Sequence, residues 1–287
     1  MQFFFVLFLF GAFAYVENAQ LPEFNPVYGY IKNIGIPTAE RIRNNEYSRI
    51  VGGVPAFPGL YPFQAGLLGD VVGLNAVSVC GASLISTSRA LTAAHCWNDG
   101  VHQIWRLTVV LGSVRLFEGG TRIETSGVAT HPNWSPSLIR NDIAVIYLPS
   151  AISVSANIAP IALPTGSEIF ESFTGYRAFA LGFGTTSDDG NISNDQTLSQ
   201  VSLNVITNSV CSVSFPLIVQ ASNICTSGAG GAGPCRGDSG GPLIVNRNNK
   251  QILIGVTSFV SALGCESGLP AAYARVTSFL DFINQNL

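Results

Sequence analysis

Short apolar runs separated by turn residues dominate the chain from residue 50 onward. The runs are rich in β-branched and other apolar residues, and glycine, proline, asparagine or serine stands between them. Many short strands at such spacing are typical of a β-barrel or β-sandwich. We therefore predict an all-β protein, with strands that include residues 90–94, 106–111, 143–148, 198–205 and 252–258.

The C-terminus has a different period. Its apolar residues recur at i, i+3, i+4, i+7 and i+11, which is one face of an amphipathic helix, and Thr277 or Ser278 can serve as the N-cap. We predict a packing helix over residues 276–287 whose buried face comprises Val276, Phe279, Leu280, Ile283 and Leu287.

The first 49 residues resemble neither pattern. Residues 1–14 form an apolar run that ends in small residues, which predicts a signal peptide cut after residue 14 or as late as residue 19. Residues 15–49 are polar, contain three prolines and lack the apolar periodicity of a core element. We interpret them as a pro-segment. No later apolar run is long enough to span a membrane, so we expect an exported, soluble protein.

Composition narrows the possible partners. The net charge is −3, which argues against nucleic acid, and only 11% of residues are charged while 30 are glycine and 15 proline, as in a turn-rich β protein. Six cysteines in an exported chain predict three disulfides, with fifteen pairings formally possible. Asn133 and Asn191 stand in glycosylation sequons.

One serine, Ser239, lies in the glycine-rich stretch GDSGGP. A serine hydroxyl becomes a good nucleophile only when a nearby base takes its proton. Of the three histidines, His95 follows an apolar strand and is fixed beside Cys96, so it is the candidate base. His131 precedes a proline in a turn and is interpreted as structural, and His102 as a solvated loop residue.

The base needs a carboxylate to hold its tautomer and orientation. Asp142 stands immediately before a continuous apolar strand, where a buried acid requires a partner. Asp99, Asp188 and Asp189 lie in turn-like sequence and are interpreted as solvated turn residues.

The glycines around Ser239 suit an oxyanion hole, because bare backbone N–H groups can approach a developing negative charge. Gly237 and Ser239 are the candidate donors. Asp238 would be buried between them and needs a cation. Cleavage after Arg49 would create an α-ammonium group at Ile50 that could pair with Asp238, which predicts an inactive precursor.

Four motifs occur in order: IVGG at 50, LTAAHC at 91, NDIAVI at 141 and CRGDSGGP at 235. Together they resemble the chymotrypsin-like serine endopeptidases of trypsin-like fold, and the stretch from residue 255 to 276 is most similar to the arthropod brachyurin and chymotrypsin-like digestive proteases. The resemblance implies two six-stranded antiparallel β-barrels, residues 50–160 and 161–275, followed by a C-terminal α-helix at 276–287.

The resemblance also implies roles for single residues. His95 would be the general base, Asp142 its orienting group and Ser239 the nucleophile, with Gly237 and Ser239 as oxyanion donors. The implied disulfides are Cys80–Cys96, Cys211–Cys225 and Cys235–Cys265. No cysteine precedes residue 80, so the cleaved pro-segment is expected to leave the enzyme.

The same comparison outlines the pocket for the side chain before the cleaved bond, the P1 residue. Gly233 would form its base, with Val260 and Ala271 in its walls, and Ser258, Phe259 and Val260 would pair with the substrate backbone as an added strand. Without an acid at Gly233, cleavage after Arg or Lys is disfavoured. We expect elastase-like or chymotrypsin-like preference for an apolar P1 residue.

The sequence thus predicts a secreted, digestive serine endopeptidase that acts on proteins or peptides as a monomer after activation by a trypsin-like protease. No cofactor, metal, nucleic acid or membrane is expected, and Glu118 and Glu124 are interpreted as surface acids. Two alternatives are kept. One is a regulatory protease of immunity or clotting, disfavoured because residues 15–49 contain no cysteine-rich module. The other is a non-catalytic homologue acting as an adaptor, disfavoured because all three residues of the triad are present.

Overall fold

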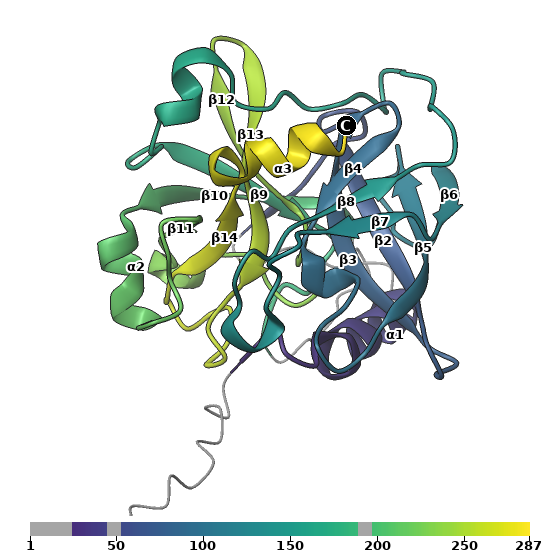
Figure 1. Cartoon of the computed structure of the whole chain (residues 1–287), viewed down its shortest axis with the longest axis horizontal. Coiled ribbons are helices and arrows are strands. Elements are labelled where there is room, and N and C mark those ends of the chain that lie inside the picture. The colour runs from purple at the N-terminus through teal and green to yellow at the C-terminus, as the bar shows by residue number, and fades with distance from the viewer. Residues whose placement is uncertain (1–24, 45–52, 189–196) are drawn as a thin grey trace, which may run out of the picture.

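The computed structural model describes residues 25–44, 53–188 and 197–287. They form two antiparallel β-sheets side by side, with few helices (Figure 1). The predicted signal peptide, the predicted activation bond between Arg49 and Ile50, and Asn191 lie outside the described residues.

The N-terminal sheet curls into a barrel. Its strand order is β6-β5-β2-β3-β4-β8-β7. β6 and β7 lie at opposite ends of this order, yet only Ser126 and Gly127 separate them in the chain, so one bent segment closes the sheet. Counted that way the barrel has six strands. The strands are β2 Gln64–Val71, β3 Val77–Ser86, β4 Arg89–Thr92, β5 Ile104–Leu111, β6 Thr121–Thr125, β7 Val128–Thr130 and β8 Ala144–Tyr147.

The C-terminal sheet closes by hydrogen bonding. β9 pairs with both β10 and β12, which completes a ring of six strands, and the short β1 pairs with the first two residues of β10, Ser199 and Gln200. The strands are β1 Val54–Pro55, β9 Arg177–Gly182, β10 Ser199–Ile206, β11 Asn223–Thr226, β12 Pro242–Arg247, β13 Lys250–Phe259 and β14 Ala271–Arg275.

The predicted all-β fold with two barrels and a C-terminal helix is confirmed. β10 shows the alternation expected of a strand with one buried face, because every second residue from Ser199 to Val205 is buried. The structure contains the disulfides Cys80–Cys96, Cys211–Cys225 and Cys235–Cys265, the pairing that the resemblance implied.

The helical segments after residue 53 are short. They are η2 Ala94–Cys96, η3 Pro136–Leu138, η4 Gly166–Phe170, α2 Asn208–Ser214, η5 Ala229–Gly231, η6 Val276–Phe279 and α3 Leu280–Gln285. No helix in the described part of the chain is long and apolar enough to cross a membrane.

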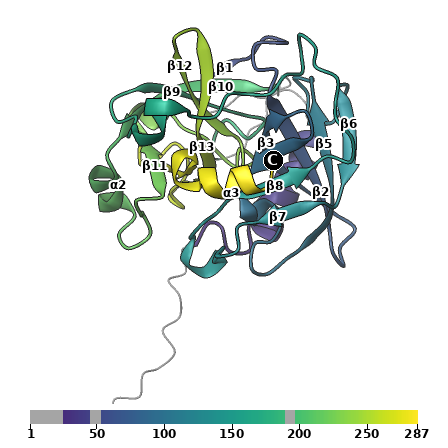
Figure 2. The same ribbon diagram turned by 45° about the horizontal axis from the view of Figure 1, so that its top comes forward.

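The C-terminal helix begins as a 3₁₀ turn and continues as α3, which runs from the second barrel towards the first (Figure 2). Asn286 ends it there, with its backbone oxygen accepting from Arg89 Nε at 2.8 Å. Of the predicted face, Val276, Phe279 and Ile283 are buried, but Leu287 is 51% exposed. The predicted side-chain cap is wrong, because the N-cap positions are Arg275 and Phe279 and neither makes a capping bond.

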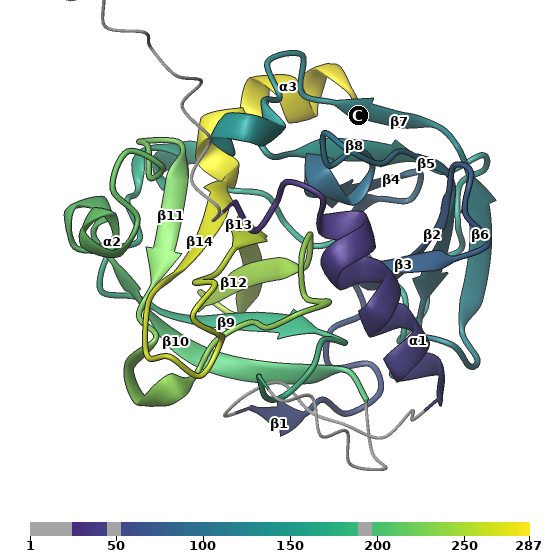
Figure 3. The same ribbon diagram turned by 90° about the horizontal axis from the view of Figure 1, so that it is seen from below.

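Residues 25–44 contain an unexpected helix, η1 Ile31–Gly35 continuing as α1 Ile36–Asn44. The expectation that the pro-segment holds no core element is wrong for these residues. Its buried residues recur at i, i+4, i+7, i+8 and i+11, a helical stripe made mostly of small side chains: Ile31, Gly35, Thr38, Ala39 and Ile42. The helix lies along β3, and the chain leading into it passes between the two barrels (Figure 3).

The C-terminal helix offers a test of the packing. Ile283→Ala should destabilise the protein by about 2–4 kcal/mol, because Ile283 is fully buried in the main core. The matched change Leu287→Ala should cost less than about 0.5 kcal/mol, since this side chain is half exposed. Denaturant unfolding of both variants measures the difference, and equal losses would contradict the described packing.

Candidate active site

Two paired strands of the first barrel bring His95 and Asp142 together. β4 pairs antiparallel with β8, with Thr92 opposite Ala144. His95 follows β4 and Asp142 precedes β8, so the pairing places them at the same end of the sheet. His95 Nδ1 lies 2.8 Å from Asp142 Oδ2, and the His95 backbone N–H donates to Asp142 Oδ1 at 2.9 Å. The two bonds fix both the ring and the turn that carries it.

A third bond reaches Asp142 from the second barrel. Ser258 Oγ donates to Asp142 Oδ2 at 2.6 Å. Sequence reasoning identified Ser258 as a substrate contact but did not predict this bond. With the Nδ1 proton of His95 directed at the carboxylate, Nε2 is left as the acceptor. Within the described residues this buried nitrogen has no hydrogen-bond partner.

Ser239 lies in the loop before β12, and both barrels hold that loop. The Gly81 N–H donates to the Ser239 backbone oxygen at 2.7 Å, and the Gly240 N–H donates to Thr257 O at 2.8 Å. Gly240 has a φ of +78°, and a Cβ there would come within 2.2 Å of Thr92 Oγ1. Glycine is therefore required for the backbone to turn this close to β4.

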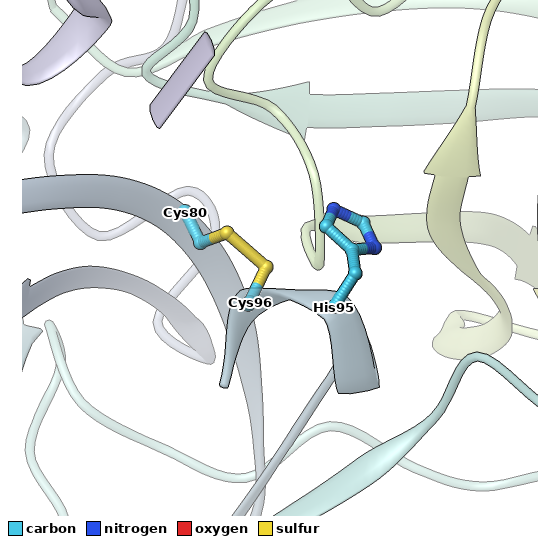
Figure 4. A group of neighbouring side chains, drawn as sticks. All are labelled: Cys80, His95 and Cys96. Atoms are coloured by element: carbon cyan, nitrogen blue, oxygen red, sulfur yellow. A yellow bond between two sulfur atoms is a disulfide. The ribbon is translucent and has the colours of Figure 1, made fainter. Parts of the chain in front are cut away.

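The disulfide Cys80–Cys96 ties the turn that carries His95 to β3 (Figure 4). His95 and the two sulfur atoms are close enough to suggest a metal site, as are Asp188, Cys235 and Cys265. In both groups the sulfurs are bonded to each other, so they are not thiolate ligands.

The two acids interpreted as surface residues are both exposed and paired with arginine. Arg115 Nη1 lies 2.7 Å from Glu118, and Arg106 Nη1 lies 3.0 Å from Glu124. Each acid therefore has a salt-bridge partner of its own on the surface, where such pairs contribute little stability.

Asp238 is buried in the loop beside Ser239. Its carboxylate accepts the N–H of Gly184 at 2.7 Å and the N–H of Cys235 at 2.8 Å. Burial raises its pKa to about 7, and the two backbone hydrogen bonds act in the opposite direction. Within the described residues Asp238 forms no ion pair, and Ile50, its predicted partner, lies outside them.

Of the residues expected at the specificity pocket, Ser258, Phe259 and Val260 line one hollow together with Ser239. Gly233 is buried, yet a Cβ built on it would meet nothing within 4 Å, so the position faces empty space. Ser258, Phe259 and Ala271 are buried and Val260 is partly buried. A small pocket between the loop of Ser239 and β13 is closed on its other side by Pro26, Tyr30 and Ile34.

Tyr30 was not singled out from the sequence, and it lies on the reactive centre. Its ring centroid is 4.6 Å from that of His95, and its hydroxyl donates to Val79 O at 3.0 Å. The hydroxyl also lies close to the Ser239 side chain and the Gly237 backbone, and Tyr30 and Ser239 line the same pocket. Burial raises the pKa of Tyr30 far above its usual value. Nothing in the sequence around Tyr30 signals this contact, because it depends on the fold of both segments.

The remaining histidines and acids lie away from this centre. His131 packs against Phe279 and Phe282, with ring centroids 5.4 and 5.0 Å apart, and burial lowers its pKa. It is a structural residue, as expected. The His102 ring lies 3.5 Å from the Asp99 carboxylate and is only partly exposed, so it is not a fully solvated residue.

Asp99 is fully buried, so the expectation of a solvated residue is wrong. It does form a turn, because its Oδ1 accepts the N–H groups of Val101 and His102. Asp188 also bonds within the loops, accepting from Cys265 N at 2.6 Å, and Asp189 lies outside the described residues.

A comparison with protein families matches residues 50–283 to the trypsin family. The chain belongs to this family. Among similar proteins is the collagenase of Hypoderma lineatum, 39% identical over 83% of this chain and 87% of its own length. Brachyurin of Leptuca pugilator is 38% identical over 82% of this chain and 96% of its own length. A solved structure of HL collagenase is 39% identical, covers 83% of this chain and 98% of its own chain, and has a TM-score of 0.75.

The family match begins at Ile50 and excludes residues 25–44. The trypsin-family part of the chain therefore accounts for both barrels and the C-terminal helix, and the helix that covers His95 belongs to the segment outside it.

The raised pKa of Asp238 predicts a pH dependence of the stability of the uncleaved chain. The unfolded chain releases this proton near pH 4, while the folded chain retains it up to about 7, so in between the folded state binds more protons. Stability should fall as the pH rises through this window, by about 1.4 kcal/mol per unit at most. Asp238→Asn should abolish the loss.

Thermal unfolding of the uncleaved chain from pH 5 to pH 8, with and without Asp238→Asn, measures this effect. Both proteins carry Ser239→Ala to prevent self-digestion. The melting temperature of the parent should decline relative to that of Asp238→Asn as the pH rises. If the difference in melting temperature between the two proteins stayed constant from pH 5 to pH 8, the raised pKa of the buried Asp238 carboxyl would be contradicted.

Proposed function

We propose that this chain is a secreted serine endopeptidase, made as a precursor, activated by cleavage after Arg49 and selective for an apolar P1 residue. The observation that carries the proposal is the 2.8 Å contact of His95 Nδ1 with Asp142 beside the loop of Ser239. Membership of the trypsin family supports the reaction class. The apolar leader and three disulfides support export.

In the proposed reaction Ser239 Oγ attacks the carbonyl carbon of the scissile bond and His95 Nε2 takes its proton. Asp142 holds the Nδ1 proton and stabilises the imidazolium. The N–H groups of Gly237 and Ser239 donate to the oxyanion. His95 then protonates the leaving amine, and a water molecule, activated by the same base, hydrolyses the acyl group from Ser239.

Activation is proposed to act through Asp238. Cleavage after Arg49 by a trypsin-like protease would free the α-amino group of Ile50. A cation beside Asp238 would lower the pKa of this carboxyl and order the loop that carries Gly237 and Ser239. The buried carboxyl with a pKa of about 7 supports this step, because a group in that state gains from a cationic partner.

The specificity follows from the empty space at Gly233, which offers no charge to a basic side chain. Val260 and Ala271 narrow the slot, which favours small or medium apolar residues. The enzyme is proposed to act on proteins or peptides, as a monomer, in a digestive lumen. Relatives named collagenase and brachyurin support protein substrates. A regulatory protease and a non-catalytic adaptor remain the competing functions.

Labelling separates an enzyme from an adaptor. After cleavage at Arg49, a fluorophosphonate probe should form a covalent adduct on Ser239, because His95 activates its hydroxyl. Ser239→Ala should abolish labelling and reduce hydrolysis of a peptide substrate by about 10⁴-fold or more. Mass spectrometry locates the adduct. A cleaved, folded protein without an adduct would support the adaptor.

A peptide library with a varied P1 residue tests the pocket. Activated enzyme should prefer aliphatic or aromatic residues over Arg and Lys. Gly233→Asp should raise kcat/KM for Arg relative to Leu by about tenfold or more, because the new carboxylate can pair with the guanidinium. Gly233→Asn is the neutral control and should not produce the change. A parent enzyme that prefers Arg or Lys would overturn the pocket assignment.

A further inference from the structure

We infer that residues 25–44, here called the cleft segment, are an inhibitor of the mature enzyme that stays bound after the chain is cut at Arg49. The inference rests on the proposed function, since it concerns access to the same site. It replaces the expectation that the pro-segment leaves once it is cleaved.

The cleft segment first contacts the surface beside β13 and the loop before β8. Asn25 donates its side-chain amide to Pro136 O at 2.9 Å and to Ser137 O at 3.1 Å. Val27 is almost fully buried in an apolar cluster that includes Ile139, Phe215 and Phe259. This start of the segment therefore occupies an apolar site beside the edge strand expected to bind substrate.

Tyr30 then covers the reactive groups. Its hydroxyl lies close to the Ser239 side chain and the Gly237 backbone, the proposed nucleophile and oxyanion donor, and Tyr30 and Ser239 line one pocket. Its ring packs edge-on against His95, whose exposed fraction is 0%. A substrate must reach His95 and Ser239 through the space that the Tyr30 side chain fills, so substrate and Tyr30 exclude each other.

The helix that follows fits the first barrel closely. The Ile31 N–H donates to Asp99 Oδ2 at 2.7 Å, which satisfies both a helix N–H and a buried carboxylate. A Cβ on Gly35 would come within 1.8 Å of Ser78 Oγ, and a Cβ on Gly237 would come within 2.8 Å of the Thr38 methyl. The small residues of the cleft segment therefore match the bare backbone of the enzyme.

The cleft segment is held as an inhibitor and not as a substrate. A side chain, Tyr30, faces Ser239, and the residues after it are helical, whereas a peptide to be cleaved must be extended along the edge strand. The cleft segment makes no backbone hydrogen bond to residues 258–260 in the described structure. Its peptide bonds are consequently not presented to the nucleophile.

Every contact described above lies before Arg49, so cutting after Arg49 removes none of them. All six cysteines are paired within the protease, and no covalent bond retains the segment after cleavage. After the cut, the cleft segment leaves the enzyme only by dissociation. Because the chain no longer joins the two parts, inhibition depends on protein concentration.

The test uses the secreted precursor with Glu46→Ile, Tyr47→Glu and Ser48→Gly, so that a protease specific for Ile-Glu-Gly-Arg cuts only after Arg49. Tyr30→Ala removes the phenol at the reactive centre. Tyr28→Ala is the matched control, because Tyr28 is 44% exposed and Tyr30 only 3%. Gly35→Val is a second disrupting variant that leaves Tyr30 in place.

The first measurement is the specific activity of each cleaved protein towards a small chromogenic peptide over a dilution series. The parent and Tyr28→Ala should gain roughly tenfold or more on dilution, as the segment dissociates. Tyr30→Ala and Gly35→Val should be fully active at every concentration. Activity of the parent that equals that of Tyr30→Ala at all concentrations would overturn the inference.

The second measurement is gel filtration of the cleaved proteins in a Ser239→Ala background, where the segment cannot be digested. The fragment should elute with the enzyme in the parent and Tyr28→Ala, and separate from it in Tyr30→Ala and Gly35→Val. Separation in the parent would again overturn the inference. If Tyr30→Ala with an intact Ser239 has lost the fragment and is still inactive, the proposed enzymatic function fails, while fragment retention in the parent still decides the inference.

Discussion

The buried carboxylate of Asp142 is the interaction on which the site depends. A buried carboxylate is stable only when hydrogen bonds replace its water, and Asp142 accepts three: from the backbone and ring of His95 and from Ser258. His95 and Asp142 belong to the first barrel, and Ser258 belongs to the second. The same carboxylate therefore orients the ring and joins the two halves. The bond from the Gly81 N–H to the Ser239 backbone oxygen also joins the two barrels, and the Gly240 N–H in the same loop donates to Thr257 O of the second barrel.

Much of this arrangement could be predicted from the sequence, because its signals are local. The apolar runs that become β4 and β8, and the positions of His95 and Asp142 at their ends, follow from periodicity and motif alone. The bond from Ser258 to Asp142 could not be predicted, since it depends on how two barrels meet. Asp99 was misjudged for the same reason: its turn is local, but its burial requires the backbone of Ile31.

The helix over the cleft escaped prediction because its apolar stripe is weak. Gly35, Thr38 and Ala39 are small and bury little apolar surface. The apolar periodicity of the sequence therefore does not reveal the helix face that they form. The enzyme surface nevertheless requires this close fit. Gly237 has a φ of +97°, which favours glycine, and the bare backbone that suits an oxyanion also leaves room for the Thr38 methyl.

We thus propose two separate controls on one loop. The first is electrostatic, because Asp238 is buried, forms no ion pair with any described residue and has a pKa of about 7. The second is steric, because Tyr30 and Thr38 lie close to Gly237. The proposed cut after Arg49 would supply an amine for the first and leave the contacts of the second unchanged. A segment that binds through small side chains and few hydrogen bonds suits such a control, since it blocks the site while tethered and can still be lost by dilution.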